Sequence, residues 1–256
     1  MKLTPVVIAA AAVGLAAATA ADKDPRVYEL RTYTAAPGKL DALSARFRDH
    51  TLKLFEKHGI SNVAYWVPID NKDNQLIYLL SHASKEARDR SFQSFGRDPA
   101  WQAAVKETEA NGRLATKVES RLLMPTDYSP SMKAATDKGN SRVIEMRTYT
   151  ATPGKLDNLN TRFRDHTLKL FEKHGMTNLG YFTPLAGTKG AEDTLIYFLA
   201  HKSEDAAKAS WDAFRKDPTW TAAKTASEQK AGGSLTVVPD GVKSVFLKPT
   251  DYSPMK

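Results

Sequence analysis

The sequence predicts an α+β protein made of two tandem repeats whose sheets pack against each other. Three observations lead to this prediction. The segments Val27–Gly59 and Val143–Gly175 align without a gap at an offset of 116 residues and are identical at 27 of 33 positions. Each copy alternates β-rich runs with helical patterns. Each copy also ends on Pro-Thr-Asp-Tyr-Ser-Pro, at 125–130 and 249–254.

The first half of a repeat reads as a strand followed by a helix. Val27–Thr34 is rich in β-forming residues, and Pro37-Gly38 makes a turn after it. A helix is predicted from Lys39 to about Lys57, with Gly59 at its end. Its apolar stripe, at helical spacing, consists of Leu40, Leu43, Phe47, Thr51 and Leu54.

The second half adds two strands, a helical region and a final strand. Ile60–Val67 and Leu76–Ser81 are the strands, Ser84 caps the next helix, and Asp98-Pro99 starts another helical segment. The last strand covers about 116–124. The order β-α-β-β-α-β is ferredoxin-like and leaves one face of each sheet bare. We therefore expect two ferredoxin-like repeats packed sheet to sheet as an intramolecular dimeric α/β barrel.

The ends of the repeats divide the chain into four parts. Residues 1–21 resemble a secretory signal peptide, with Lys2, an apolar run and a small-residue cleavage site at Ala18-Thr19-Ala20. Because that run is short and alanine-rich, cleavage is favoured over membrane anchoring, and no stable membrane span is expected afterwards. Repeat 1 is assigned to 22–130, a linker to 131–141 and repeat 2 to 142–256. The expected location is periplasmic or secreted.

Composition excludes several classes of function. The chain has no cysteine, which excludes thiol chemistry and cysteine-ligated metals. Its formal charge is +8, but basic and acidic residues are interspersed, so no nucleic-acid partner is expected. No phosphate-binding glycine loop or nucleophile elbow is present in the sequence. The expected partner is a small molecule, and assembly of pseudo-dimers into a homo-oligomer is left open.

The order of short motifs resembles the NIPSNAP family. The first copy carries Tyr28-Glu29-Leu30-Arg31-Thr32-Tyr33, Pro37-Gly38-Lys39-Leu40, His58-Gly59 and Asp98-Pro99-x-Trp101, and the second copy has matching motifs from Ile144 to Trp220. This resemblance implies the dimeric α/β-barrel superfamily, whose relatives include cofactor-free monooxygenases, haem-degrading enzymes and small isomerases. NIPSNAP domains have no well-defined reaction, so the resemblance implies a fold more than a function.

Alternation along the first strand provides the main candidate site. Glu29, Arg31 and Tyr33 share one face, and the more apolar Tyr28 and Leu30 share the other. We expect the apolar face to lie under the helices. The polar face would then point into the barrel, opposite its counterparts Glu145, Arg147 and Tyr149. The favoured interpretation is a buried ion-pair network that fixes the pairing of the sheets. The alternative is a catalytic pocket in which Arg binds a carboxylate and Glu or Tyr moves a proton.

Histidines on the first helix provide a second candidate. His50 and His58, with His166 and His174 in the other copy, flank the apolar stripe and are expected to face the space between helix and sheet. There they are candidate haem ligands, as the family relatives suggest. The favoured alternative is a structural histidine, and His58 also suits a helix C-terminus. His82 and His201 are expected to be structural, and no spacing predicts a dedicated metal site.

The expected function is therefore that of an exported NIPSNAP-like protein that binds a small apolar or anionic ligand in the α/β barrel, with no defined reaction and no cofactor. One alternative is a cofactor-independent monooxygenase or isomerase. A further alternative is a haem-binding or haem-processing protein.

Overall fold

The computed structural model describes residues 26–132 and 142–256. The predicted signal segment 1–21 and most of the predicted linker lie outside these residues. The first repeat consists of β1 (Val27–Ala35), α1 (Leu40–Arg46), the π-helical turn η1 (Phe47–Thr51), α2 (Leu52–Lys57), β2 (Ser61–Pro68), β3 (Gln75–His82), α3 (Lys85–Arg97), α4 (Pro99–Thr108) and β4 (Ala115–Pro125). The second consists of β5 (Val143–Thr150), α5 (Leu156–Arg162), η2 (Phe163–Thr167), α6 (Leu168–Lys173), β6 (Thr177–Pro184), β7 (Thr194–His201), α7 (Glu204–Lys216), α8 (Pro218–Lys230) and β8 (Val242–Pro249).

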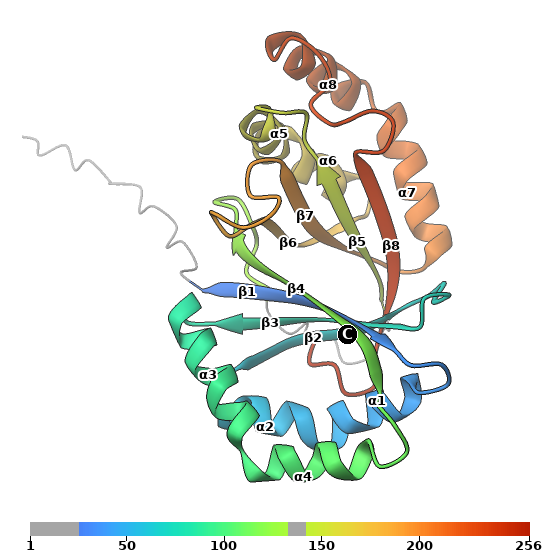
Figure 1. Ribbon diagram of the computed structural model, residues 1–256. Helices are drawn as coiled ribbons and strands as arrows, with labels where there is room; N and C mark the ends of the chain where they lie inside the picture. Colours follow the sequence, from blue (N-terminus) through green and yellow to red (C-terminus); the bar gives the residue numbers. More distant parts are fainter. Residues whose placement is uncertain (1–25, 133–141) are drawn as a thin grey trace, which may run out of the picture.

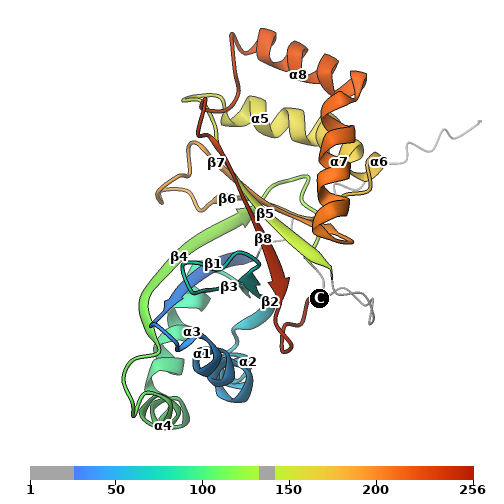
Figure 2. The same ribbon diagram turned by 90° about the vertical axis from the view of Figure 1, so that its right-hand side faces the viewer.

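The described strands form one closed barrel in the order β1-β3-β2-β8-β5-β7-β6-β4. The repeats join at two seams, where Trp66 of β2 is opposite Pro249 of β8 and Leu123 of β4 is opposite Pro184 of β6. Figure 1 shows the helices of each repeat on the outer side of its own half, and Figure 2 shows β4 and β8 running along the junction. The predicted fold, two ferredoxin-like β-α-β-β-α-β repeats forming an intramolecular dimeric α/β barrel, is confirmed.

The barrel interior is apolar and is shared by both repeats. Tyr28 of β1 contacts Phe182 of β6, on the other side of β4, with ring centroids 4.9 Å apart, and Trp66 stacks on Phe198 at 5.2 Å. The buried residues of this cluster are Tyr28, Leu30, Ala64, Trp66, Ile77, Leu79, Leu123, Met132, Ile144, Phe182, Ile196, Phe198, Ala200, Leu247 and Met255. Each repeat therefore supplies part of a core that neither could cover alone.

This packing reverses the predicted orientation of the first strand. Tyr28 and Leu30 point into the barrel, whereas Tyr33 packs with the cluster beneath the helices of its own repeat. The prediction that Glu29, Arg31 and Tyr33 face their counterparts across the barrel was wrong. Closing the barrel buries both faces of the sheet, so the more apolar face goes to the shared interior. The charged face lies beneath the helices, whose side chains can satisfy it.

The first helix is interrupted by a π-helical turn, which changes the phase of its apolar stripe. In η1 the Thr51 hydroxyl donates to the Arg46 carbonyl at 3.1 Å, and Thr167 repeats this contact in η2. The extra residue in the turn widens the buried stripe, so that Phe55, which is 2 % exposed, joins the predicted Leu54, which packs partly buried against the same cluster. Such turns recur at functional sites in proteins.

The predicted caps of the later helices are confirmed. The Ser84 side chain accepts a hydrogen bond from the Ala87 amide at 3.1 Å, and Asp98 accepts one from Ala100 at 2.9 Å. The equivalent residues Ser203 and Asp217 cap α7 and α8. These caps satisfy backbone donors that helix geometry leaves without partners.

The closing segment of each repeat packs on the opposite repeat. The Ser129 hydroxyl accepts from the amide of Tyr181, and the Asp127 carboxylate pairs with Arg164 at 2.7 Å. In the reverse direction, Ser253 accepts from the Tyr65 amide, and Asp251 pairs with Arg48 at 2.9 Å. The repeated Pro-Thr-Asp-Tyr-Ser-Pro motif is thus a reciprocal clamp between the repeats.

Candidate functional site

A buried carboxylate under the helices of the first repeat gathers several donors. Arg31 Nη1 and Ser120 Oγ each donate to Glu29 at 2.6 Å. Arg88 of α3 reaches both carboxylate oxygens, at 2.8 and 2.9 Å. His82 Nε2 lies 3.2 Å from the same carboxylate. The predicted grouping of Glu29 with Arg31 is present, although it lies on the helix side of the sheet.

The second repeat builds the same cluster with different donors. Arg147 Nη1 and Ser244 Oγ donate to Glu145 at 2.6 Å, and Trp211 Nε1 donates at 2.7 Å. His201 Nε2 lies 2.9 Å from this carboxylate. This repeat has no counterpart of the second arginine, because α7 carries Ala207 four residues after its cap, where α3 carries Arg88.

Both buried carboxylates are ionised at neutral pH. Burial acts to raise the pKa of Glu145, but the hydrogen bond from His201 and the charge of Arg147 lower it to about 2. Burial opposes ionisation of Glu29 too, and Arg88, His82 and Arg31 together hold its pKa well below the usual range. Carboxylates so occupied are poor general bases, which agrees with the structural interpretation of this network.

Tyr149 lies between the Glu145 cluster of the second repeat and a pocket. Arg147 Nη2 donates to the Tyr149 hydroxyl at 3.4 Å, and the Arg147 guanidinium lies 4.2 Å from the centre of the Trp211 ring. Tyr149 in turn lines a pocket of about 360 Å³ between the sheet and the helices of the second repeat. The lining residues are Tyr149, Arg162, Phe163, Thr167, Phe171, Phe214, Trp220, Lys224, Glu228, Ser234, Thr236, Val238 and Val242.

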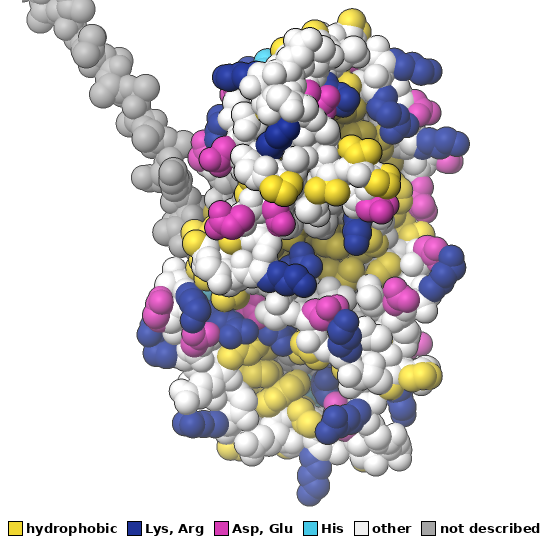
Figure 3. Space-filling view, turned by 45° about the horizontal axis from the view of Figure 1, so that its top comes forward, with side chains coloured by type: hydrophobic (Ala, Val, Ile, Leu, Met, Phe, Trp, Pro, Cys, Tyr) yellow, Lys and Arg dark blue, Asp and Glu magenta, His cyan; other side chains and the backbone are white. Residues whose placement is uncertain are grey.

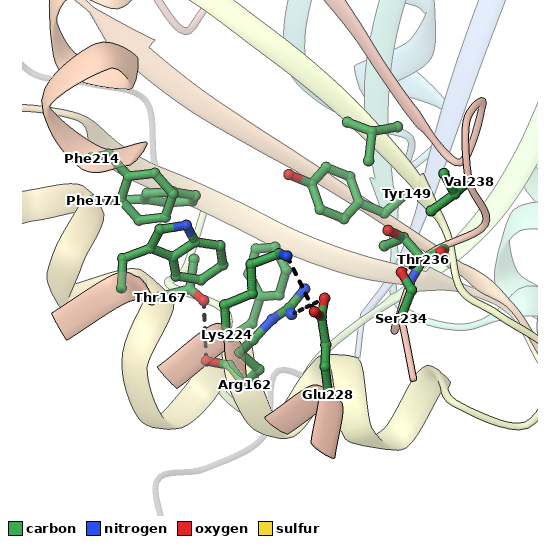
Figure 4. Close-up of a pocket in the computed structure, with 13 residues that line it drawn as sticks. Tyr149, Arg162, Thr167, Phe171, Phe214, Lys224, Glu228, Ser234, Thr236 and Val238 are labelled. Carbon is green, nitrogen blue, oxygen red and sulfur yellow. Dashed lines mark hydrogen bonds and ion pairs between the residues drawn. The ribbon is translucent and has the colours of Figure 1, made fainter. Parts of the chain in front are cut away.

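The second-repeat pocket has three chemically distinct sides. Figure 4 shows the rings of Phe171 and Phe214 at one end, and Val238 with its neighbouring loop residues at the other. Arg162, Lys224 and Glu228 lie together along α5 and α8, below the Tyr149 ring. The space-filling view shows hydrophobic side chains recessed among charged ones in the upper half of the molecule, which is the second repeat (Figure 3).

An insertion forms one wall of this pocket. In the first repeat, Ala115 pairs with Ala35 of β1 and Val118 pairs with Tyr33. The two partners therefore lie three positions apart in the sequence. Their counterparts in the second repeat, Thr236 and Val242, lie six positions apart. The extra residues form a loop held to Thr150, whose amide donates to the Gly241 carbonyl at 2.7 Å and whose carbonyl accepts from Val237 at 3.0 Å.

The inserted loop brings apolar side chains to the pocket mouth. Val238 is 75 % exposed, and Val237 and Val242 are 39 % and 41 % exposed. Exposed apolar side chains that cluster beside a recess are a common feature of ligand-binding grooves. The second repeat thus differs from the first by a loop that adds apolar groups beside the sheet face at Tyr149.

The candidate haem ligands occupy two different environments. His58 Nε2 lies 2.7 Å from Asp98, and His174 Nε2 lies 2.8 Å from Asp217, so these rings join the end of one helix to the cap of another. His50 is half-buried and His166 is exposed. The exposure of His166 disagrees with the prediction that it faces the space between helix and sheet, whereas the half-buried His50 is compatible with it. A haem role for these four residues stays a prediction.

The pocket brings together one predicted residue and several that sequence reasoning missed. Tyr149 lines it directly, Arg147 contacts Tyr149, and Glu145 lies one step further away. His201 and Trp211 complete the cluster and were not predicted as site residues. Antiparallel register could have found His201, because it pairs with Val143, two positions from Glu145 and on the same face of the sheet.

Two further features are absent from the described part of the chain. Within 26–132 and 142–256, no three His, Asp or Glu side chains are grouped so that they could hold a metal ion. Over the same ranges, no helix has both the length and the apolar character needed to cross a bilayer.

The closed barrel of two pseudo-symmetric repeats, with a pocket between one sheet and its helices, places the protein in the dimeric α/β-barrel class. The chain belongs to the NIPSNAP family, whose model matches residues 28–130 and 144–254. It is similar to a NipSnap homolog protein of Dictyostelium discoideum, with 27 % identity over 221 residues, 84 % of this chain and 87 % of that protein. The prediction of tandem NIPSNAP domains is confirmed.

Similar solved structures support the fold. A putative monooxygenase from Lactobacillus acidophilus NCFM superposes with a TM-score of 0.56 at 10 % identity, covering 88 % of this chain and 94 % of that chain. An anthrone oxidase-like protein superposes with a TM-score of 0.58 at 13 % identity, covering 91 % of this chain and 96 % of that one. At such identities the likeness extends to the fold alone.

Proposed function

We propose that this protein binds one small apolar or anionic molecule in the second-repeat pocket. The observation that carries the proposal is the pocket itself, about 360 Å³ in volume, with an aromatic end and a few polar groups. Pockets of this size that combine an apolar lining with a few converging polar groups are typical of small-molecule sites. The exposed valines at the mouth support the same proposal, since a bound apolar molecule would cover them.

Titration with the neutral apolar dye Nile red tests this proposal. Val242→Trp places a large ring at the pocket mouth, and we expect it to raise the Kd for the dye at least tenfold by filling the space. Val118→Trp is the matched control, because Val118 is opposite Tyr33 in the first repeat as Val242 is opposite Tyr149 in the second. The control should change the Kd less than twofold. Equal effects of both variants, or no dye binding to the wild type, would contradict the proposal.

A second candidate function is cofactor-independent oxygenation or isomerisation in the same pocket. The observation that favours it is the Tyr149 hydroxyl, which lines the pocket and accepts a hydrogen bond from Arg147 at 3.4 Å. A tyrosine beside a fixed cation can donate a proton to a substrate or stabilise a developing negative charge. Two proteins with this fold are described as a putative monooxygenase and as anthrone oxidase-like.

Substitution of the hydroxyl tests this second candidate. The substrate in the assay is whatever small molecule is recovered from the purified protein by mass spectrometry. Tyr149→Phe should lower its turnover by about a hundredfold or more, the usual scale for a lost proton donor, while Nile red binding is kept. Tyr33→Phe, the equivalent change in the first repeat, should leave turnover unchanged. Full activity in Tyr149→Phe would remove this residue from the reaction.

We further propose that the protein acts outside the cytoplasm, on the basis of the signal-like segment 1–21. The mass of the protein isolated from its native cells decides this. Loss of about the first 20 residues supports export, and retention of Met1 contradicts cleavage.

A further inference from the structure

The charged side of the second-repeat pocket carries more positive than negative charge. Arg162 Nη1 lies 3.4 Å from Glu228, and Lys224 Nζ lies 3.2 Å from the same carboxylate. Two cations therefore share one counter-charge. In Figure 4 all three side chains lie close together below Tyr149, and the Lys224 side chain is 52 % exposed.

The first repeat has the same arginine and glutamate in a tighter ion pair. There Arg46 Nη1 contacts Glu109 at 2.8 Å, a much tighter pair than its counterpart. The position of Lys224, four residues after the Trp of the Asp-Pro-x-Trp motif, is taken in the first repeat by Val105. The second repeat thus has an added cation and a weakened internal ion pair.

Arg162 is held in a costly environment for a cation. It is only 5 % exposed, its guanidinium lies 5.2 Å from the centre of the Trp220 ring, and its Nε has no hydrogen-bond partner among the described residues. Burial lowers its pKa from the ordinary arginine value, and the charge of Glu228 opposes that effect. Arg46 shares the unpartnered Nε. The distinguishing features of Arg162 are its long contact to Glu228 and the neighbouring open space.

We propose that the molecule bound here is an apolar acid, with one anionic group placed between Arg162 and Lys224. This inference rests on the proposed function and specifies its ligand class. An incoming carboxylate or sulfonate gives the two cations a second counter-charge, and charge-assisted contacts of this kind are stronger than neutral ones. The apolar body lies against Phe171 and Phe214 and extends towards Val238 at the mouth.

An anionic dye and a neutral dye together distinguish this inference from the proposed function. The anionic probe is 8-anilinonaphthalene-1-sulfonate, and the neutral probe is Nile red. Lys224→Val installs the residue of the first repeat, and we expect it to raise the Kd of the anionic dye about tenfold, the equivalent of one charge-assisted contact. Nile red should bind this variant as tightly as the wild type or more tightly. The control Lys230→Val, an exposed lysine at the end of the same helix, should change neither dye.

Glu228→Gln should lower the Kd of the anionic dye, which is the opposite of the effect of Lys224→Val. Because a neutral amide competes less for Arg162 and Lys224, the anionic dye should bind this variant several times more tightly, with Nile red unchanged. The acid-binding inference would be overturned if Lys224→Val left the Kd of the anionic dye unchanged and Glu228→Gln raised it. The proposed function would not be affected by that result. Failure of both dyes to bind the wild type would instead overturn the proposed function.

Discussion

Glu145→Gln should lower the free energy of unfolding by about 3 kcal/mol at pH 7, among the largest effects expected of any single substitution in this protein. The carboxylate is 1 % exposed and neutralises Arg147, while it also accepts from His201, Trp211 and Ser244. A neutral amide leaves the guanidinium buried without a counter-charge and cannot accept all these bonds. Chemical denaturation followed by fluorescence measures the loss.

The pH dependence of this loss provides a specific check. The pKa of Glu145 is lowered from 4.5 to about 2 in the folded state, so its stabilising effect is complete above the unfolded pKa. It is lost as pH falls towards the folded pKa. The stability difference between wild type and Glu145→Gln should therefore be full at pH 7 and less than half as large at about pH 3. Glu107→Gln, on an exposed position of α4, should cost less than about 0.5 kcal/mol at both pH values. A difference independent of pH would contradict the ion-pair explanation.

The second large effect concerns the repeats themselves. A fragment of residues 22–130 should not form a stable monomer, because removing its sibling exposes a sheet face that carries Tyr28, Leu30 and Trp66. It also frees two strand edges, at β2 and β4, which pair with the second repeat in the full chain. Size-exclusion chromatography with light scattering should show a dimer or larger species.

Co-expression with residues 142–256 is the matched control. The two fragments should copurify as a one-to-one complex, because the seams and the clamps of Asp127 with Arg164 and Asp251 with Arg48 require no covalent link. A monomeric, cooperatively unfolding fragment 22–130 would contradict the shared core.

Much of the fold could be predicted from the sequence because its signals are local. Strand alternation, the caps Ser84 and Asp98, and the glycine that ends the first helix each depend on a few neighbouring residues. Gly59 indeed has a φ of +74°. Pairing of the two bare sheet faces followed from topology, and the duplicated sequence made that inference strong.

The orientation of the polar strand face could not be predicted by the same reasoning. Apolar character was used to decide which face lies under the helices, yet in a closed barrel both faces are buried. Glu29 is accommodated on the helix side because Arg88 and Ser120, distant in sequence, donate to it there along with Arg31. Such compensation depends on tertiary packing, and alternation alone contains no information about it.

The pocket was missed for a related reason. Comparison of the repeats emphasises identical positions, whereas the pocket depends on positions where they differ. Lys224 replaces Val105, and the loop around Val238 has no counterpart in the first repeat. Duplication preserves the shared core, while divergence in one copy is free to create a binding site. The positions at which the repeats differ were therefore the more informative ones.

A crystal structure of the protein with bound 8-anilinonaphthalene-1-sulfonate tests the central claim most directly. We expect dye density between β5 and α8, with the sulfonate within hydrogen-bonding distance of Arg162 and Lys224 and the rings near Phe171. Density for the dye inside the barrel beside Trp66, or under the helices of the first repeat beside Trp101, would contradict it.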